Sequence, residues 1–229
     1  MNYIELVRRE LPYEIVEELK LLRTNLQFCG KDKKVLMLTS CLGGEGKSTL
    51  SLALARTFAE LGKQVLLIDS DLRKSVFENS VIDGSIHYGL THYLSGQCHL
   101  SEVIYCTETE HLEVIPAGVL APNPTELISN ESFTQLIQSC RRSYDYVILD
   151  CSPLGMVVDA AVVAPHCDGA ILVIESGTIK YRFAREVAKK LQNTSCPVLG
   201  VVLNKVDRHS NRYGNYYSYG HRYTAYYQK

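Results

Sequence analysis

The chain has 229 residues, of which 46% are hydrophobic and 21% are charged, and its formal net charge is −1. A chain of this length and composition can bury the core of one α/β domain. The near-zero net charge excludes a global field that would draw the protein toward nucleic acid or a membrane surface.

The sequence has neither the apolar length of a membrane span nor the pattern of a secretion signal. No apolar run approaches the roughly 18 residues that cross a bilayer. The N-terminal MNYIELVRRELPYE carries charges where a signal peptide is apolar. The eight cysteines include no C-x-x-C pair, which indicates free thiols in a reducing compartment. We therefore expect a cytoplasmic protein.

Taken in chain order, the apolar patterns predict helices that alternate with buried strands. A first helix is expected over about 12–27, where apolar residues recur on one face and charged residues lie outside it. Continuous Val, Ile and Leu runs then predict strands at 35–40, 64–69, 112–118, 144–150, 169–175 and 198–204. Helices are expected between them at 48–61, 89–96, 131–141, 157–165 and 181–192.

The predicted strands are continuously apolar, which indicates burial on both faces of a sheet. We therefore predict an α/β fold with a mostly parallel sheet that is flanked by helices on both faces. Sheets of this kind bind ligands beyond the carboxyl ends of their strands. The polar residues that directly follow the strands are accordingly the candidate site residues.

The first of these strands is followed by SCLGGEGKST, which has the pattern of a phosphate-binding loop. Glycines let backbone amides turn toward phosphates, and the N-terminus of the next helix adds a positive dipole. Lys47 would reach the β- and γ-phosphates, and the Ser48 hydroxyl would bind Mg²⁺. Cys41 stands where the loop usually has its first glycine. The candidate nucleotide-binding residues are Gly43, Gly44, Glu45, Gly46, Lys47, Ser48 and Thr49.

Two further strand ends carry carboxylates. LLIDSDLRK places Asp69 and Asp71 two residues apart at the end of a strand, and YDYVILDCSP places Asp150 at the end of another. Oxygen ligands of this kind suit a Mg²⁺–nucleotide complex, and Asp150 holds the position of the carboxylate that holds Mg²⁺ in P-loop enzymes. We therefore predict a P-loop NTPase fold in which Ser48, Asp69, Asp71 and Asp150 bind the metal.

The identity of the purine base is left open by these motifs. LNKVD contains Asn204, Lys205 and Asp207 in the N-K-x-D spacing that guanine-specific P-loop proteins usually carry.

Together the motifs resemble those of the bacterial tyrosine kinases (BY-kinases) of capsule and exopolysaccharide synthesis. These are P-loop proteins related to the partition and septum-site ATPases. The resemblance covers nearly the whole chain, because GLTHYLSG, IPAGVLAPNPTELI and GVVLNKVD match family segments beyond the three nucleotide motifs. It implies that ATP and Mg²⁺ are the cofactors and that Asn204 touches adenine. Gly43, where a proline is common, and CSP, in place of T-P-P, depart from the family pattern.

EELKLLRTNL resembles the family's E-x-x-R-x-x-R helix, which joins neighbouring subunits into a ring. Glu17 and Arg23 match, whereas Lys20 replaces the middle arginine and lacks its bidentate fork. The resemblance implies a homo-oligomeric ring whose interface includes these three residues, with an oligomerisation helix over about 12–28. A solvated charged face is the alternative interpretation of this helix.

The C-terminal segment contains seven of the 15 tyrosines within 17 residues. The resembling kinases phosphorylate such a cluster on themselves, which implies autophosphorylation of Tyr213, Tyr216, Tyr217, Tyr219, Tyr223, Tyr226 and Tyr227. We expect a P-loop kinase domain over 1–206 and a flexible, tyrosine-rich tail over 207–229. A tail that stacks on single-stranded nucleic acid is an alternative, but few cationic residues support it, and we expect no nucleic-acid partner.

The resemblance implies an ATP-dependent protein-tyrosine kinase that phosphorylates its tail in trans between subunits. Lys47, Asp69, Asp71 and Asp150 are its expected catalytic residues. A tyrosine hydroxyl has a pKa near 10 and must lose its proton during attack. Asp69 is the candidate either for accepting that proton or for orienting it through a metal-bound water.

The resemblance also implies partners and a process. A separate transmembrane adaptor would recruit and activate the kinase at the inner face of the cell membrane. A cognate tyrosine phosphatase and further protein substrates would complete the control of capsular and exopolysaccharide synthesis and export. The competing interpretation is a partition or septum-site type ATPase that acts as a nucleotide-switched dimer, although Leu42 stands where that class has its signature lysine.

Overall fold

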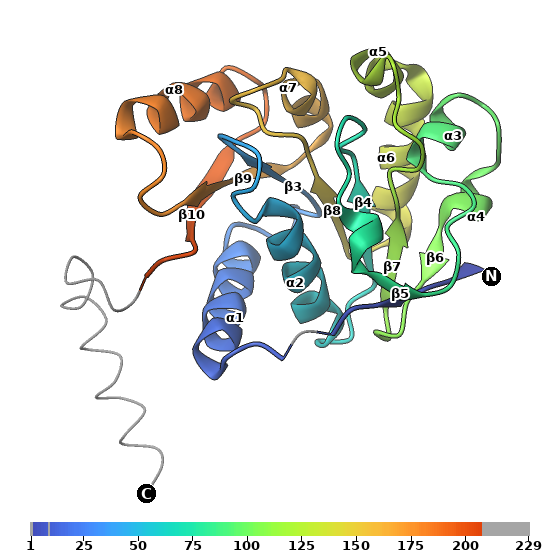
Figure 1. Ribbon diagram of the computed structural model, residues 1–229, viewed down its shortest axis with the longest axis horizontal. Helices are drawn as coiled ribbons and strands as arrows, with labels where there is room; N and C mark the ends of the chain where they lie inside the picture. The colour runs from blue at the N-terminus through green and yellow to red at the C-terminus, as the bar shows by residue number, and fades with distance from the viewer. Residues whose placement is uncertain (1, 9, 208–229) are drawn as a thin grey trace, which may run out of the picture.

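A computed structural model describes residues 2–8 and 10–207, and an eight-stranded sheet is its framework (Figure 1). The strand order is β1-β6-β7-β4-β8-β3-β9-β10. Neighbours from β7 to β10 run parallel, while β6 pairs antiparallel with β7. The prediction of a mostly parallel sheet is confirmed. The strands are β1 (Asn2–Tyr3), β3 (Val35–Ser40), β4 (Val65–Asp69), β6 (Tyr105–Cys106), β7 (Leu112–Ile115), β8 (Tyr146–Asp150), β9 (Gly169–Glu175) and β10 (Val198–Asn204).

Helices cover both faces of this sheet (Figure 1). One hydrophobic cluster joins the sheet to α1 (Tyr13–Phe28) and α2 (Lys47–Ala59). The other joins it to α6 (Glu131–Ser143), α7 (Asp159–Val163) and α8 (Tyr181–Gln192). Successive strand residues alternate between the clusters, as Met37 and Leu38 do in β3. Continuous apolar runs are therefore required, because each strand packs against helices on both sides.

Several elements differ from the sequence-based expectations. The expected strand 112–118 ends at Ile115, and the expected helix 89–96 is the five-residue α3 (Leu90–Leu94). The expected helix 157–165 is α7 followed by a 3-10 turn (Ala164–His166), because a proline inside it removes one backbone donor. Other short elements were not predicted: the strands β1, β2 (Glu5–Leu6), β5 (Val81–Asp83) and β6, the helices α4 (Leu100–Val103) and α5 (Pro124–Ser129), and a 3-10 turn (Phe77–Ser80).

Two further sequence-based expectations concern membrane spans and the C-terminal tyrosines. None of the helices within residues 2–8 and 10–207 has the length and hydropathy that a bilayer crossing requires. The seven candidate autophosphorylation tyrosines all lie outside the described residues, as does most of the expected tail.

The carboxyl ends of the parallel strands lie along one edge of the sheet and carry the predicted site. The register places Asp69 of β4 directly beside Asp150 of β8. On its other side, Asp150 pairs in register with Leu38 of β3, two residues before the phosphate-binding loop begins. The three strand ends that sequence motifs single out are therefore adjacent in space.

Candidate active site

The loop between β3 and α2 adopts a shape that two glycines permit. Gly44 and Gly46 have φ values of +85° and +86°, in the left-handed region that favours glycine. A Cβ atom on Gly46 would also come within 2.2 Å of the Asn204 side-chain nitrogen. Gly46 is directly followed by α2, so the loop delivers the backbone amides of Lys47 and Ser48 at a helix N-terminus.

Glu45 is buried and braces this loop from within. One carboxylate oxygen accepts a hydrogen bond from the Leu42 amide at 2.7 Å, and the other accepts from the Glu175 amide at 3.2 Å. The Glu45 side chain thus ties the loop to the end of β9. Glu45 is one of the predicted nucleotide-binding residues, but its carboxylate has a structural role. Only its backbone amide is left to bind a phosphate.

The end of β10 holds the same loop from the neighbouring side. Asn204 Nδ2 donates to the Glu45 carbonyl oxygen at 2.8 Å. Lys205 Nζ donates to the Gly44 carbonyl oxygen at 2.7 Å and pairs with the Glu175 carboxylate at 2.8 Å. The predicted base-contacting residue Asn204 therefore lies against the phosphate-binding loop.

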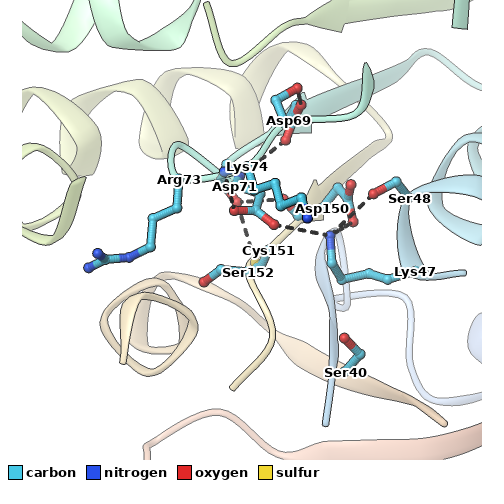
Figure 2. A network of polar contacts seen from close by, with 12 residues as sticks. Ser40, Lys47, Ser48, Asp69, Asp71, Arg73, Lys74, Asp150, Cys151 and Ser152 are labelled. Atoms are coloured by element: carbon cyan, nitrogen blue, oxygen red, sulfur yellow. Dashed lines mark hydrogen bonds and ion pairs between the residues drawn. The ribbon is translucent and has the colours of Figure 1, made fainter. Parts of the chain in front are cut away.

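Lys47 is buried among the predicted catalytic carboxylates (Figure 2). Its Nζ donates to Asp150 Oδ1 at 2.6 Å and to Ser48 Oγ at 3.3 Å, and lies 3.9 Å from Asp71 Oδ2. Burial alone would lower the pKa of Lys47, but the Asp150 carboxylate outweighs it and raises the pKa. The lysine therefore stays cationic in a site with little water, where it can attract phosphate oxygens strongly.

The two aspartates after β4 are held by their own loop. Asp69 accepts hydrogen bonds from Ser75 Oγ at 2.5 Å and from the Asp71 amide at 3.1 Å. Burial, followed by the nearby Asp150 carboxylate, raises the pKa of Asp69 to about 7. Asp71 accepts from the Lys74 amide at 3.2 Å, and burial raises its pKa as well. Asp71 has one oxygen facing Lys47, whereas both Asp69 oxygens are engaged within the loop.

The donor set fits a magnesium ion that arrives with a nucleotide. Within residues 2–8 and 10–207, no three His, Cys, Asp or Glu side chains are grouped closely enough to hold a cation by themselves. Mg²⁺ does not need such a cage, because it usually takes one or two carboxylates together with phosphate oxygens and water. Ser48, Asp71 and Asp150 surround Lys47 Nζ and can supply this hydroxyl and these carboxylates.

An ion pair that the sequence analysis did not predict lies behind the acidic loop. Arg73 Nε donates to Asp159 Oδ2 at 2.5 Å, and Thr125 Oγ1 donates to Asp159 Oδ1, also at 2.5 Å. The Asp159 side chain is only 3% exposed. Burial would raise the pKa of Asp159, but the bonds from Arg73 and Thr125 lower it. Arg73 stands in LLIDSDLRK and could have been suspected, whereas Asp159 lies in no recognised motif.

The three predicted interface residues of α1 do not act as one group. Glu17 and Lys20 form an exposed ion pair at 2.8 Å. Arg23 instead turns toward α2, where its Nη1 donates to the Thr57 carbonyl oxygen at 2.7 Å. Any ring contact made by Arg23 would therefore compete with its bond to α2.

Comparisons with known proteins find relatives in sequence and in fold. Residues 33–195 match the protein family described as AAA domain. The chain is 42% identical over 201 residues to the tyrosine-protein kinase CpsD of Streptococcus agalactiae, covering 88% of each chain. Among solved structures, the kinase domain of the Escherichia coli tyrosine kinase ETK superposes with a TM-score of 0.81 at 28% identity, covering 92% of each chain. The septum site-determining protein MinD of Pyrococcus horikoshii, complexed with Mg-ADP, gives a TM-score of 0.66 at 25% identity over 78% of this chain and 72% of that chain.

Proposed function

This chain belongs to the bacterial tyrosine-protein kinases, and from that premise we propose that it transfers the γ-phosphoryl group of ATP to tyrosines of its own C-terminal segment. One observation carries the proposal. Lys47 lies within 4 Å of Asp71, Asp150 and Ser48 at the end of a phosphate-binding loop. Such an arrangement gathers a phosphate-binding cation and metal-binding oxygens at one point.

The nucleotide would be held by the loop between β3 and α2. Backbone amides around Gly44 and Gly46, together with the amides at the start of α2, would bind the phosphates. Lys47 would exchange its bond with Asp150 for the β- and γ-phosphate oxygens. The Mg-ADP in the MinD structure supports the same ligand class here. We assign ATP as the nucleotide. We propose that Asn204, the last residue of β10, which contacts this loop, lies next to the base.

Phosphoryl transfer would follow from positioning and charge neutralisation. The phenolic oxygen forms a bond to the γ-phosphorus as the bond to the β–γ bridging oxygen breaks, and ADP leaves with that oxygen. Mg²⁺, when bound, neutralises charge on the β- and γ-phosphates. Asp71, Asp150 and Ser48 would hold the metal, and Lys47 would stabilise charge on the transferring group. Since both Asp69 oxygens are already bonded, we favour its role in orienting a water that takes the phenolic proton.

The acceptor would be the tail of a second copy. We assign residues 1–206 to the kinase domain and 207–229 to the tail, with Tyr213, Tyr216, Tyr217, Tyr219, Tyr223, Tyr226 and Tyr227 as acceptors. A homo-oligomeric ring would bring one tail to the next site, with Glu17, Lys20 and Arg23 in or near the interface. The exposed Glu17–Lys20 pair is available to a neighbour as it stands.

Regulation would require other proteins. We propose that a separate transmembrane adaptor recruits this kinase to the inner face of the cell membrane and stimulates it. A tyrosine phosphatase would reverse the modification, and the cycle would control synthesis and export of a capsular or extracellular polysaccharide. The name of the Streptococcus agalactiae relative, a tyrosine-protein kinase, supports the chemistry, and the process is inferred from the family resemblance.

Mapping of phosphotyrosine by mass spectrometry tests this function. We expect the purified full-length protein, incubated with ATP, Mg²⁺ and the cytoplasmic segment of the adaptor, to gain phosphate on tyrosines between 213 and 227. Omission of Mg²⁺ should prevent it. Hydrolysis of ATP without any phosphotyrosine, in the presence of the adaptor segment, would instead support a septum-site type ATPase.

A further inference from the structure

Four large apolar side chains are exposed on two loops at the carboxyl edge of the sheet. Val119 and Leu120 follow β7, and Met156 and Val158 follow β8. Their exposed fractions are 60%, 66%, 63% and 62%. We call these four residues the apolar collar. An apolar group gathered beside a charged site is an interaction surface candidate, whereas singly scattered apolar residues need no explanation.

Both loops border the catalytic groups. The Ala121 amide, directly after Leu120, donates to the carbonyl oxygen of Leu72, the residue after Asp71, at 3.3 Å. On the other loop, the Met156 sulfur lies 4.0 Å from where a Cβ on Gly43 would be. One pair of collar residues therefore adjoins the acidic loop after β4, and the other pair adjoins the start of the phosphate-binding loop.

The ion pair behind the acidic loop links the two loops that carry the collar. Arg73 extends away from Lys47 (Figure 2) and reaches Asp159, which directly follows Val158. Thr125, a few residues after Leu120, bonds to the same carboxylate and also accepts from Arg73 Nη2 at 3.1 Å. Segments that follow three strands are thus linked through one buried carboxylate, next to the loops that carry the collar.

We propose that the apolar collar docks the phenol ring of a tail tyrosine from a second copy of this chain. The inference rests on the proposed function and adds the surface that recognises the acceptor. A ring packed on the collar would place its hydroxyl at the edge of the sheet that carries Lys47 and Asp71. Aromatic rings gain most of their binding energy from such apolar contact, while the hydroxyl stays available.

Charge and chain length favour the tail as the occupant. Residues 207–229 carry four cations and one carboxylate, a net charge of +3, so residues 1–206 carry −4 because the whole chain carries −1. The described chain ends at Asp207, just after β10, on the same edge of the sheet as the collar. The 22 residues from 208 to 229 have a fully extended length of roughly 70 Å.

A kinetic experiment with separate donor and acceptor tests the collar. The donor is the full-length protein in which the seven tail tyrosines are replaced by serine. The acceptor is the full-length protein carrying Lys47→Met, which keeps its tail tyrosines. In the donor, Leu120→Glu or Val158→Glu should raise the KM for the acceptor on the order of tenfold, because each removes apolar contact with the ring. The KM for ATP should change by less than about twofold.

Controls separate the collar from the proposed function. Leu61→Glu changes an equally apolar, exposed residue beyond the end of α2 and should leave the acceptor KM unchanged. Leu120→Ser and Val158→Ser serve as uncharged second variants if a glutamate prevents folding, and they should shift the KM in the same direction. An unchanged acceptor KM in all four variants would overturn the collar. If the variants changed only the degree of stimulation by the adaptor segment, the collar would also be overturned. If the parent donor left the acceptor unmodified, the proposed function itself would be refuted.

Discussion

Replacing Lys47 by methionine is expected to lower the initial rate of tyrosine phosphorylation by about 10²–10³-fold. Methionine keeps the length of the side chain but removes the cation that lies within 4 Å of both Asp71 and Asp150. Without that cation, negative charge on the transferring phosphoryl group is left beside two carboxylates. The rate is measured as phosphotyrosine formed per minute at saturating ATP with the adaptor segment present.

Loss of Lys47 is also expected to affect folding stability, so control variants must separate that effect from the effect on the rate. Asp150 is buried, so loss of its partner leaves a carboxylate that must find a proton or water. Lys47→Arg keeps the charge and serves as a folding control, although its planar group cannot occupy the same position. Lys190→Met, on the exposed face of α8, is the matched change elsewhere. A folded Lys47→Met protein with more than half of the parent rate would contradict the assigned role.

Asp71→Asn is expected to lower kcat by roughly a hundredfold and to raise the Mg²⁺ concentration that gives half of the maximal rate. Asparagine is nearly isosteric, and its carbonyl oxygen can still accept the bond from the Lys74 amide. The change therefore removes the negative charge of the proposed metal ligand, and we expect the loop after β4 to keep its shape. Initial rates measured across a Mg²⁺ titration report both quantities.

Asp83→Asn provides the control for this second substitution. Asp83 is an exposed aspartate in β5, and we expect its replacement to leave the Mg²⁺ dependence unchanged. If Asp71→Asn lowered kcat without moving the Mg²⁺ midpoint, Asp71 would act on the transferring group and not on the metal. An unaltered kcat would remove Asp71 from the catalytic set.

The sequence was sufficient to predict where the candidate catalytic side chains meet. Lys47 and Asp150 are separated by 103 positions in the chain. Asp150 ends one apolar run and Lys47 follows another after a short loop, and buried parallel strands bring such ends to one edge. The motif around Asp69 and Asp71 completes the same edge. Sequence motifs at the ends of buried strands thus predict which distant residues come together, because the carboxyl ends of parallel strands share one edge of the sheet.

Other parts of the site depend on contacts that no local pattern encodes. The Arg73–Asp159 pair joins loops after different strands, and the sequence holds no periodicity that relates them. Glu45 lies within a motif of phosphate-binding residues, yet its carboxylate braces the loop. Arg23 matches an interface motif, yet it bonds to α2 in the single chain. Strands of two or three residues, such as β1 and β2, are too short to show an alternating pattern.

The most direct test of the central claim separates the site from the acceptor in two distinguishable chains. Wild-type protein is mixed with isotopically labelled protein carrying Lys47→Met, together with ATP, Mg²⁺ and the adaptor segment, and phosphotyrosine is mapped on the labelled chain. The account predicts phosphate on labelled tyrosines between 213 and 227, transferred from the wild-type site. A labelled tail without phosphotyrosine, while the wild-type chain phosphorylates other substrates, would contradict it.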